Sequence, residues 1–325
     1  MAGPDGGRPA MIAALSPYHL TTREPAAMAA LLLAERVVTM VPTPFDGAER
    51  SHVERAVSRS PRYLDLMESW RWSVPLWSAG VITGDAEGDD AADEVRTVCA
   101  RLRDDEHLAP LRLLMRESLF DDERSYLDAI ARDLLRAGPD PAISIPVAAA
   151  MDRFAALRGM VVMRSFPTSV AQRAEHGMAE KRFAFAMPLL IQASGERLLE
   201  AREALGSSLT DLGRTVRAAA FGEASALDVA DAARDAARAF EPLHADLARP
   251  CEDEDDLHVI IGTASVTAVT LPVDAVLDSS LAAFNSFAQT PVRTTSEPSS
   301  LPALRDPLAG ERVVSLVVRS MGRRR

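Results

Sequence analysis

The chain has 325 residues, of which 47% are hydrophobic, and its formal net charge is −11. This length allows one large domain or two ordinary ones, and the hydrophobic content excludes disorder of the whole chain. The negative charge argues against binding to nucleic acid or to an anionic membrane, because both would repel the protein.

The rarity of certain residue types excludes several kinds of site. Lys181 is the single lysine among the 36 lysine and arginine residues, so a phosphate-binding loop ending in Gly-Lys is absent and a Schiff-base enzyme would have to use this residue. The arginine excess is typical of a high-GC bacterial genome. Two distant cysteines and six histidines without ligand spacing predict no metal and no cofactor.

The first segments predict a strand, a helix and a second strand. Residues 1–9 are rich in Gly, Pro and Asp, and we expect them to be disordered. The apolar run 10–15 predicts a strand, residues 23–34 a helix, and the β-branched run 36–41 a strand that ends at prolines. Residues 16–20, between the first two elements, are predicted to form a loop. This order is typical of a βαβ unit.

The densest group of reactive side chains lies between the first strand and the first helix. It runs from Ser16 to Glu24 with the sequence SPYHLTTRE. In α/β folds, ligands bind at this end of the strands. His19, Arg23 and Glu24 are the candidate catalytic residues, with His19 as acid and base and Arg23 holding an anionic group. Tyr18 and Thr21 are candidate ligand-binding residues.

Helix capping is the alternative interpretation of the same segment. Thr22 is a natural N-cap before Pro25, and the spacing of Thr21 and Glu24 fits a capping box. Capping accounts for the threonines and the glutamate, but it accounts for neither His19 nor Tyr18.

All three tryptophans lie within eight residues. Residues 51–70 predict a helix broken at Pro61, and residues 73–82 predict a further strand. Trp70, Trp72 and Trp77 are candidate ligand-binding residues that would line an aromatic pocket or a partner surface. The edge of the core is the other interpretation. The acidic loop 84–90 that follows lacks the spacing of a calcium loop.

The middle of the chain alternates between predicted helices and strands. Helices are predicted from residue 90 to about 102, at 123–137 and at 146–157. Strands are predicted at 143–145, 160–163 and 183–191.

Residues 194–248 predict two long helices joined near residues 221–223. Apolar residues recur at Leu205, Leu209, Leu212 and Val216, at spacings of four, three and four. An alanine-rich stripe follows on the second helix, so a helical hairpin with a coiled-coil-like seam is expected.

The last part of the chain returns to strand patterns. Residues 257–271 predict a hairpin or one long bent strand, 273–287 a helix, and 312–318 a strand. We therefore expect an α/β or α+β fold, a mixed sheet with flanking helices and the long hairpin at about 194–248. The predicted organisation is a single domain over 10–287, a Pro/Ser/Thr-rich loop at 288–311, and a C-terminal strand with a basic tail at 312–325.

Two functions from different classes fit this sequence. The first is a non-catalytic protein that binds a protein partner or forms a homo-oligomer, indicated by the helix seam, the tryptophans and the absence of a catalytic motif. The second is an enzyme or ligand-binding protein for a small anionic molecule, with its site at Ser16–Glu24. No run approaches 18 uncharged apolar residues and the first apolar run is too short for a signal peptide, so the cytoplasm is the expected location.

Overall fold

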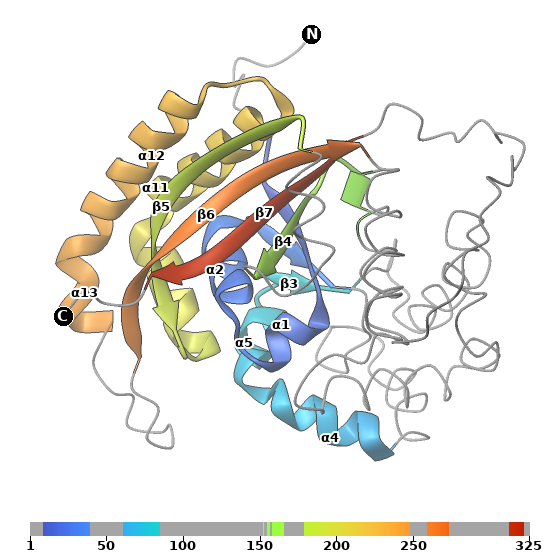
Figure 1. The fold of residues 1–325 in the computed structure, drawn as a ribbon. Helices are drawn as coiled ribbons and strands as arrows, with labels where there is room; N and C mark the ends of the chain where they lie inside the picture. Colours follow the sequence, from blue (N-terminus) through green and yellow to red (C-terminus); the bar gives the residue numbers. More distant parts are fainter. Residues whose placement is uncertain are drawn as a thin grey trace, which may run out of the picture.

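The computed structural model describes residues 9–39, 61–84, 158–165, 179–247, 259–272 and 312–321, together with residues 152, 155 and 156. These residues build a seven-stranded sheet in the order β3-β2-β1-β4-β7-β6-β5, with helices packed against it (Figure 1). The predicted mixed sheet with flanking helices is confirmed.

Five of the strands run parallel to one another. They are β1 (Ile12–Leu15), β2 (Arg36–Val38), β3 (Ile82–Thr83), β4 (Val161–Ser165) and β7 (Arg312–Met321). In the register, Ala13 on β1 faces Val37 on one side and Val161 on the other. Most of their residues are buried, which explains the nearly continuous apolar and β-branched runs. The strands predicted near 10–15, 36–41, 160–163 and 312–318 are confirmed, with shifted ends.

The other two strands are long and extend the sheet beyond β7. β5 (Lys181–Ile191) pairs antiparallel with β6 (Ile260–Pro272), and β6 pairs antiparallel with β7. Of the two alternatives for residues 257–271, the structure has one long strand. Lys181 opens β5 opposite Thr270, and its side chain is exposed.

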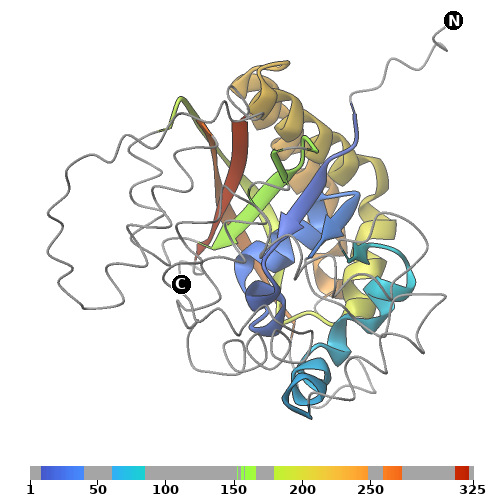
Figure 2. The same cartoon turned by 90° about the vertical axis from the view of Figure 1, so that its right-hand side faces the viewer.

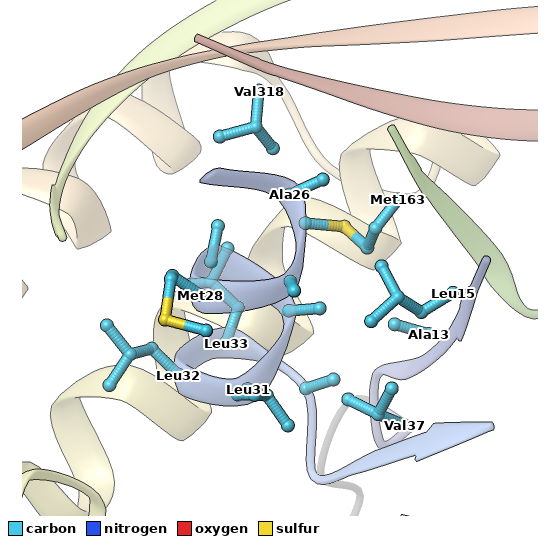
Figure 3. Packing of buried hydrophobic residues seen from close by; sticks show 14 of the residues in the cluster. Ala13, Leu15, Ala26, Met28, Leu31, Leu32, Leu33, Val37, Met163 and Val318 are labelled. Atoms are coloured by element: carbon cyan, nitrogen blue, oxygen red, sulfur yellow. The ribbon is translucent and has the colours of Figure 1, made fainter. Parts of the chain in front are cut away.

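A single apolar helix forms the centre of the core. α2 (Pro25–Leu33) has the sequence PAAMAALLL, and each residue from 26 to 33 is buried. It packs against β4, β5 and β7 and also against α11 (Gly195–Phe221). Figure 3 shows its leucines and Met28 pointing outward in different directions, with Leu15 and Met163 beside its first turn. A helix that is apolar on all sides is typical of a core position.

The predicted helical hairpin is confirmed. α11 and α12 (Ala226–Phe240) run side by side along the long strands (Figure 1). Gly222, with φ of 85°, ends α11, and a capping box between Ser225 and Asp228 starts α12. The four apolar residues of the predicted seam on α11 are all buried. The outer face of α12 carries ion pairs between Asp231 and Arg234 and between Asp235 and Arg238. The seam therefore faces the core of its own chain.

Two features hold the hairpin against α2. Gly213 lies so close to the end of α2 that an added Cβ would lie 2.3 Å from the carbonyl oxygen of Leu33. One guanidinium nitrogen of Arg202 donates to the carbonyls of Leu31 and Ala34 at 2.6 and 2.8 Å, and the other donates to that of Glu35 at 3.2 Å. Arg202 thus satisfies carbonyls that the end of a helix leaves without partners.

The strand predicted at 73–82 is wrong for most of its length. α4 (Pro61–Ser69) is followed by the 3₁₀ turn η1 (Arg71–Ser73) and by α5 (Val74–Ser78), and only Ile82 and Thr83 form a strand. Pro75 sits in the first turn of α5, where its missing N–H is tolerated, and the Ser73 hydroxyl donates to the Trp70 carbonyl at 2.7 Å. These local contacts outweigh the β preference of the aromatic residues.

Several predictions lie outside the described residues. They concern residues 1–8, the helix at 51–60, the acidic loop and helix at 85–102, the helix at 123–137, the strand at 143–145, the helix at 273–287, the loop at 288–311 and the tail at 322–325. Among the helices that are described, none combines the length and the apolar character needed to cross a bilayer.

Candidate functional site

The Ser16–Glu24 segment lies where the direction of the chain through the parallel sheet reverses. From β1 the chain goes to β2 on one side, whereas β4 pairs with β1 on the other. Both views show α1 (Pro17–Thr21), α4 and α5 beyond the carboxyl ends of β1 and β4 (Figures 1 and 2). In open α/β sheets, ligands bind outside the carboxyl ends of strands at such a switch point.

Residues 17–21 form a short helix where a loop was predicted. The Ser16 hydroxyl accepts from the backbone N–H of Tyr18 at 3.4 Å, and Pro17 occupies the first turn. This Ser-Pro start is a common helix signal, but five residues are too few to show helical periodicity in a sequence. The turn carries Tyr18, His19 and Thr21 in fixed positions.

His19 and Glu24 form a hydrogen-bonded pair across the turn between α1 and α2. His19 is 7% exposed, and its Nδ1 lies 3.1 Å from the Oε2 of Glu24. The backbone N–H of Glu24 also donates to the carbonyl of His19 at 3.0 Å, so the pair is held by main chain and side chain together. The ring of Tyr18 contacts the His19 ring edge-on at 5.8 Å. The Nε2 of His19 makes no hydrogen bond within the described part of the chain.

The surroundings keep Glu24 ionised and Tyr18 neutral. Burial alone would raise the pKa of Glu24, but the hydrogen bond and charge of His19 outweigh it, with smaller contributions from Ser165 and Thr22, and the pKa is lowered. Burial raises the pKa of the Tyr18 phenol, and the negative charge of Glu24 adds to this effect. An ionised carboxylate at Nδ1 fixes the histidine tautomer and leaves Nε2 as the nitrogen available for proton transfer.

Arg23 joins this turn to two distant segments. Its guanidinium carbon lies 4.8 Å from the centre of the Trp72 ring, and its Nη1 donates to the carbonyl of Gln192, after β5, at 3.4 Å. Arg23 and Gln192 are the positive-φ residues other than glycine within the described segments, with φ of 49° and 60°. Non-glycine residues in this conformation are uncommon and gather at functional sites.

Trp70 and Trp77 are core residues, and their indole N–H groups are satisfied. Trp70 donates to the Thr21 hydroxyl at 2.8 Å, and Trp77 donates to the Ser73 hydroxyl at 3.2 Å. The structure therefore brings Thr21 together with Trp70 and brings Arg23 together with Trp72. Trp77 belongs to α5, and its indole N–H bonds to Ser73 and not to the residues of the His19 turn.

The predicted cap of α2 is wrong. The N-cap is Glu24, and its side chain makes no capping hydrogen bond. The hydroxyls of Thr21 and Thr22 instead donate to the carbonyls of Pro17 and Tyr18, four residues back, at 3.1 and 3.0 Å. These carbonyls belong to the first two residues of α1, so both hydroxyls are bound to α1 and do not cap α2.

Two polar residues of this region, Ser165 and Thr39, were missed in the sequence. Ser165 ends β4 and contributes to the lowered pKa of Glu24. Within the described segments, the Thr39 hydroxyl, just after β2, is buried without a hydrogen-bond partner, as is Nε1 of Trp72. Only the order of the strands brings residues 16–24 and Ser165 together. In the sequence, Ser165 lies two residues after the apolar run 160–163, but many serines lie close to such a run.

The described residues hold no group of three His, Cys, Asp or Glu side chains that could bind a metal ion. Comparisons with protein-family models, with curated proteins and with solved structures found no match to this chain. The candidate function therefore rests on the geometry of the site.

Proposed function

We propose that this protein is an enzyme that moves a proton on a small anionic molecule, with its site at the carboxyl ends of β1 and β4. The observation that carries the proposal is the His19–Glu24 pair, 3.1 Å apart at the switch point of the parallel sheet. A carboxylate on Nδ1 and a histidine that can take or give a proton at Nε2 are the parts of a general acid–base pair.

The division of roles follows from charge. Glu24, with its lowered pKa, orients His19 and stabilises the imidazolium that forms when Nε2 takes a proton. Arg23 supplies a positive charge next to this pair in the sequence, and its planar guanidinium suits a carboxylate or phosphate of the substrate. Its contacts include the face of the Trp72 ring at 4.8 Å and the carbonyl of Gln192 at 3.4 Å, which place the guanidinium beside the turn.

The second candidate function is association with a protein partner or with another copy of the chain, without catalysis. The helix seam and the tryptophans that suggested it are buried within the chain. A point of contact available to a partner is the exposed side chain of Leu227, at the start of α12, which is 67% accessible. Sedimentation velocity of the wild type and of Leu227→Ser tests it, and a concentration-independent monomer for both would contradict self-association.

For location we propose the cytoplasm, and for partners we propose a small molecule and no nucleic acid. The net charge of −11 argues against nucleic acid as a partner, because the protein would repel its phosphate backbone.

The main proposal can be tested by searching for a compound into which the protein catalyses the exchange of deuterium from the solvent. The purified protein is incubated in D₂O with the small-molecule fraction of a bacterial extract, and mass spectrometry records which compounds gain deuterium or change in amount. We expect at least one anionic compound to change with the wild type. His19→Gln should abolish the change, and Arg23→Gln should weaken it about tenfold, as for loss of a charged hydrogen bond.

Asp235→Asn is the matched control, because Asp235 pairs with Arg238 on the exposed face of α12. This variant should behave as the wild type does. A compound that changes equally with the wild type and with His19→Gln would contradict the assigned role of His19, and no change with any compound would leave association as the better proposal.

A further inference from the structure

A groove separate from the candidate site opens between the hairpin and the long strands. Its volume is about 700 Å³, within the range of sites that bind drug-sized molecules. The last turn of α12 and the segments η5 (Glu241–Leu243) and α13 (His244–Leu247) form one wall. β5, β6 and the end of β7 form the other side. Pro242 ends the regular helix here, so the chain beyond α12 follows a new direction.

The lining is mainly apolar and partly exposed. The side chains of Met187, Phe240, Ile261 and Met321 contribute to it, with Ala237 and Gly262 leaving space between them. Met321, at the end of β7, is 42% exposed. Large apolar side chains exposed beside a concave surface are typical of a binding groove.

The polar residues of the groove set the charge of its ligand. Glu241 is the carboxylate among the described lining residues, which include no arginine or lysine. His244 and Thr263 are the other lining residues with polar side chains. Among the described lining residues, Glu241 therefore supplies a negative charge that would attract a cationic group of a ligand.

We propose that the groove binds an apolar molecule that carries a cationic amine, with its apolar part on Phe240 and Met321 and its amine at Glu241. The ligand is of the opposite charge to the one proposed for the His19 site, and the two sites share no residue. The two proposals can therefore fail separately.

The test uses three probes of equal chain length, decylamine, decanol and decanoate, kept below their micelle concentrations and titrated by calorimetry. We expect decylamine to bind with a stoichiometry of one and decanoate to bind at least tenfold more weakly. Glu241→Gln should weaken the binding of decylamine about fivefold, which is the effect of losing a partly exposed charge pair. The affinity for decanol should stay unchanged.

Ala237→Phe tests the place of binding. Ala237 is exposed and lines the groove, so the larger ring fills space without entering the core. We expect this variant to lose decanol and decylamine binding, with circular dichroism and the melting temperature showing that the fold is kept. Asp235→Asn, outside the lining, should bind all three probes as the wild type does.

Three results would overturn the proposal. One is no binding of decylamine to the wild type, and another is equal binding of amine and carboxylate. The third is decylamine binding that is insensitive to both Glu241→Gln and Ala237→Phe, since that would indicate general attraction of the amine to an acidic protein.

Discussion

The two halves of the sheet differ in strand length and in what surrounds the strands. β1, β2 and β3 have four, three and two residues, whereas β5, β6 and β7 have eleven, thirteen and ten. The short strands end early, and polar residues such as Ser16, Thr39 and Ser165 follow or end them. The long strands carry the helical hairpin. The short half therefore carries the candidate site, and the long half carries the scaffold, the hairpin that packs on the core.

The largest effect should come from the closest contact of the scaffold. Gly213→Ala places a Cβ 2.3 Å from the Leu33 carbonyl, so α11 and α2 must separate, and we expect a loss of about 3 kcal/mol in the free energy of unfolding. Urea denaturation measures it. Ser207→Ala, on the exposed side of the same helix, should be neutral or slightly stabilising. Equal stability of the two variants would mean that the contact is not close in solution.

The next largest effect should come from Arg202. Arg202→Met leaves three carbonyls at the end of α2 without their charged donor, and we expect a loss of about 2 kcal/mol. Arg214→Met is the matched control, because Arg214 forms a half-exposed pair with Glu35 that is expected to contribute less than about 1 kcal/mol. Thermal and urea unfolding of both variants would show whether a buried arginine cap, rather than charge alone, stabilises the scaffold.

In the short half, His19 should matter more for function than for stability. His19→Ala removes a buried ring and one hydrogen bond, and we expect a loss of about 1 kcal/mol, with the melting temperature within a few degrees of the wild type. A loss of 3 kcal/mol or more, comparable to that of Gly213→Ala, would place His19 with the scaffold and argue against the catalytic role.

The smallest effect should be a dependence of stability on pH. Since the folded-state pKa of Glu24 is below its ordinary value of 4.5, its contribution is complete above that pH and is lost as the pH falls through the lower folded-state pKa. Unfolding curves of Glu24→Gln between pH 6 and pH 3 should show a difference from the wild type of less than about 1 kcal/mol that shrinks toward the acid end. A difference that grows toward the acid end would show that the pKa of Glu24 is raised.

Sequence patterns predicted the elements of the scaffold better than those of the site. The seam from Leu205 to Val216 predicted the hairpin, because burial of one helix face requires apolar residues at that spacing. Runs of β-branched residues predicted β2 and β7, because such side chains pack well on a buried, pleated sheet. The order of the strands could not be predicted, since each pattern reports burial and not which strand is the neighbour.

At the candidate site, the sequence indicated a segment that follows a strand but not the contacts of its side chains. The Ser16–Glu24 segment was selected for its position after a strand, and the structure places it at the switch point. The partnership of Glu24 with His19 instead of a helix cap depends on α1 being helical, which five residues could not indicate. The roles of Ser165 and Gln192 depend on tertiary structure, because these residues lie far along the chain.

The position of β7 has a consequence for synthesis of the protein. This strand comes latest in the chain among those described, yet it lies between β4 and β6. Until residues 312–321 have left the ribosome, β4 and β6 each present an unpaired apolar edge, a recognised risk for aggregation. A nascent chain would therefore remain dependent on chaperones until almost all of these residues are made, and ribosome-stalled chains ending before and after residue 321 should differ sharply in protease resistance.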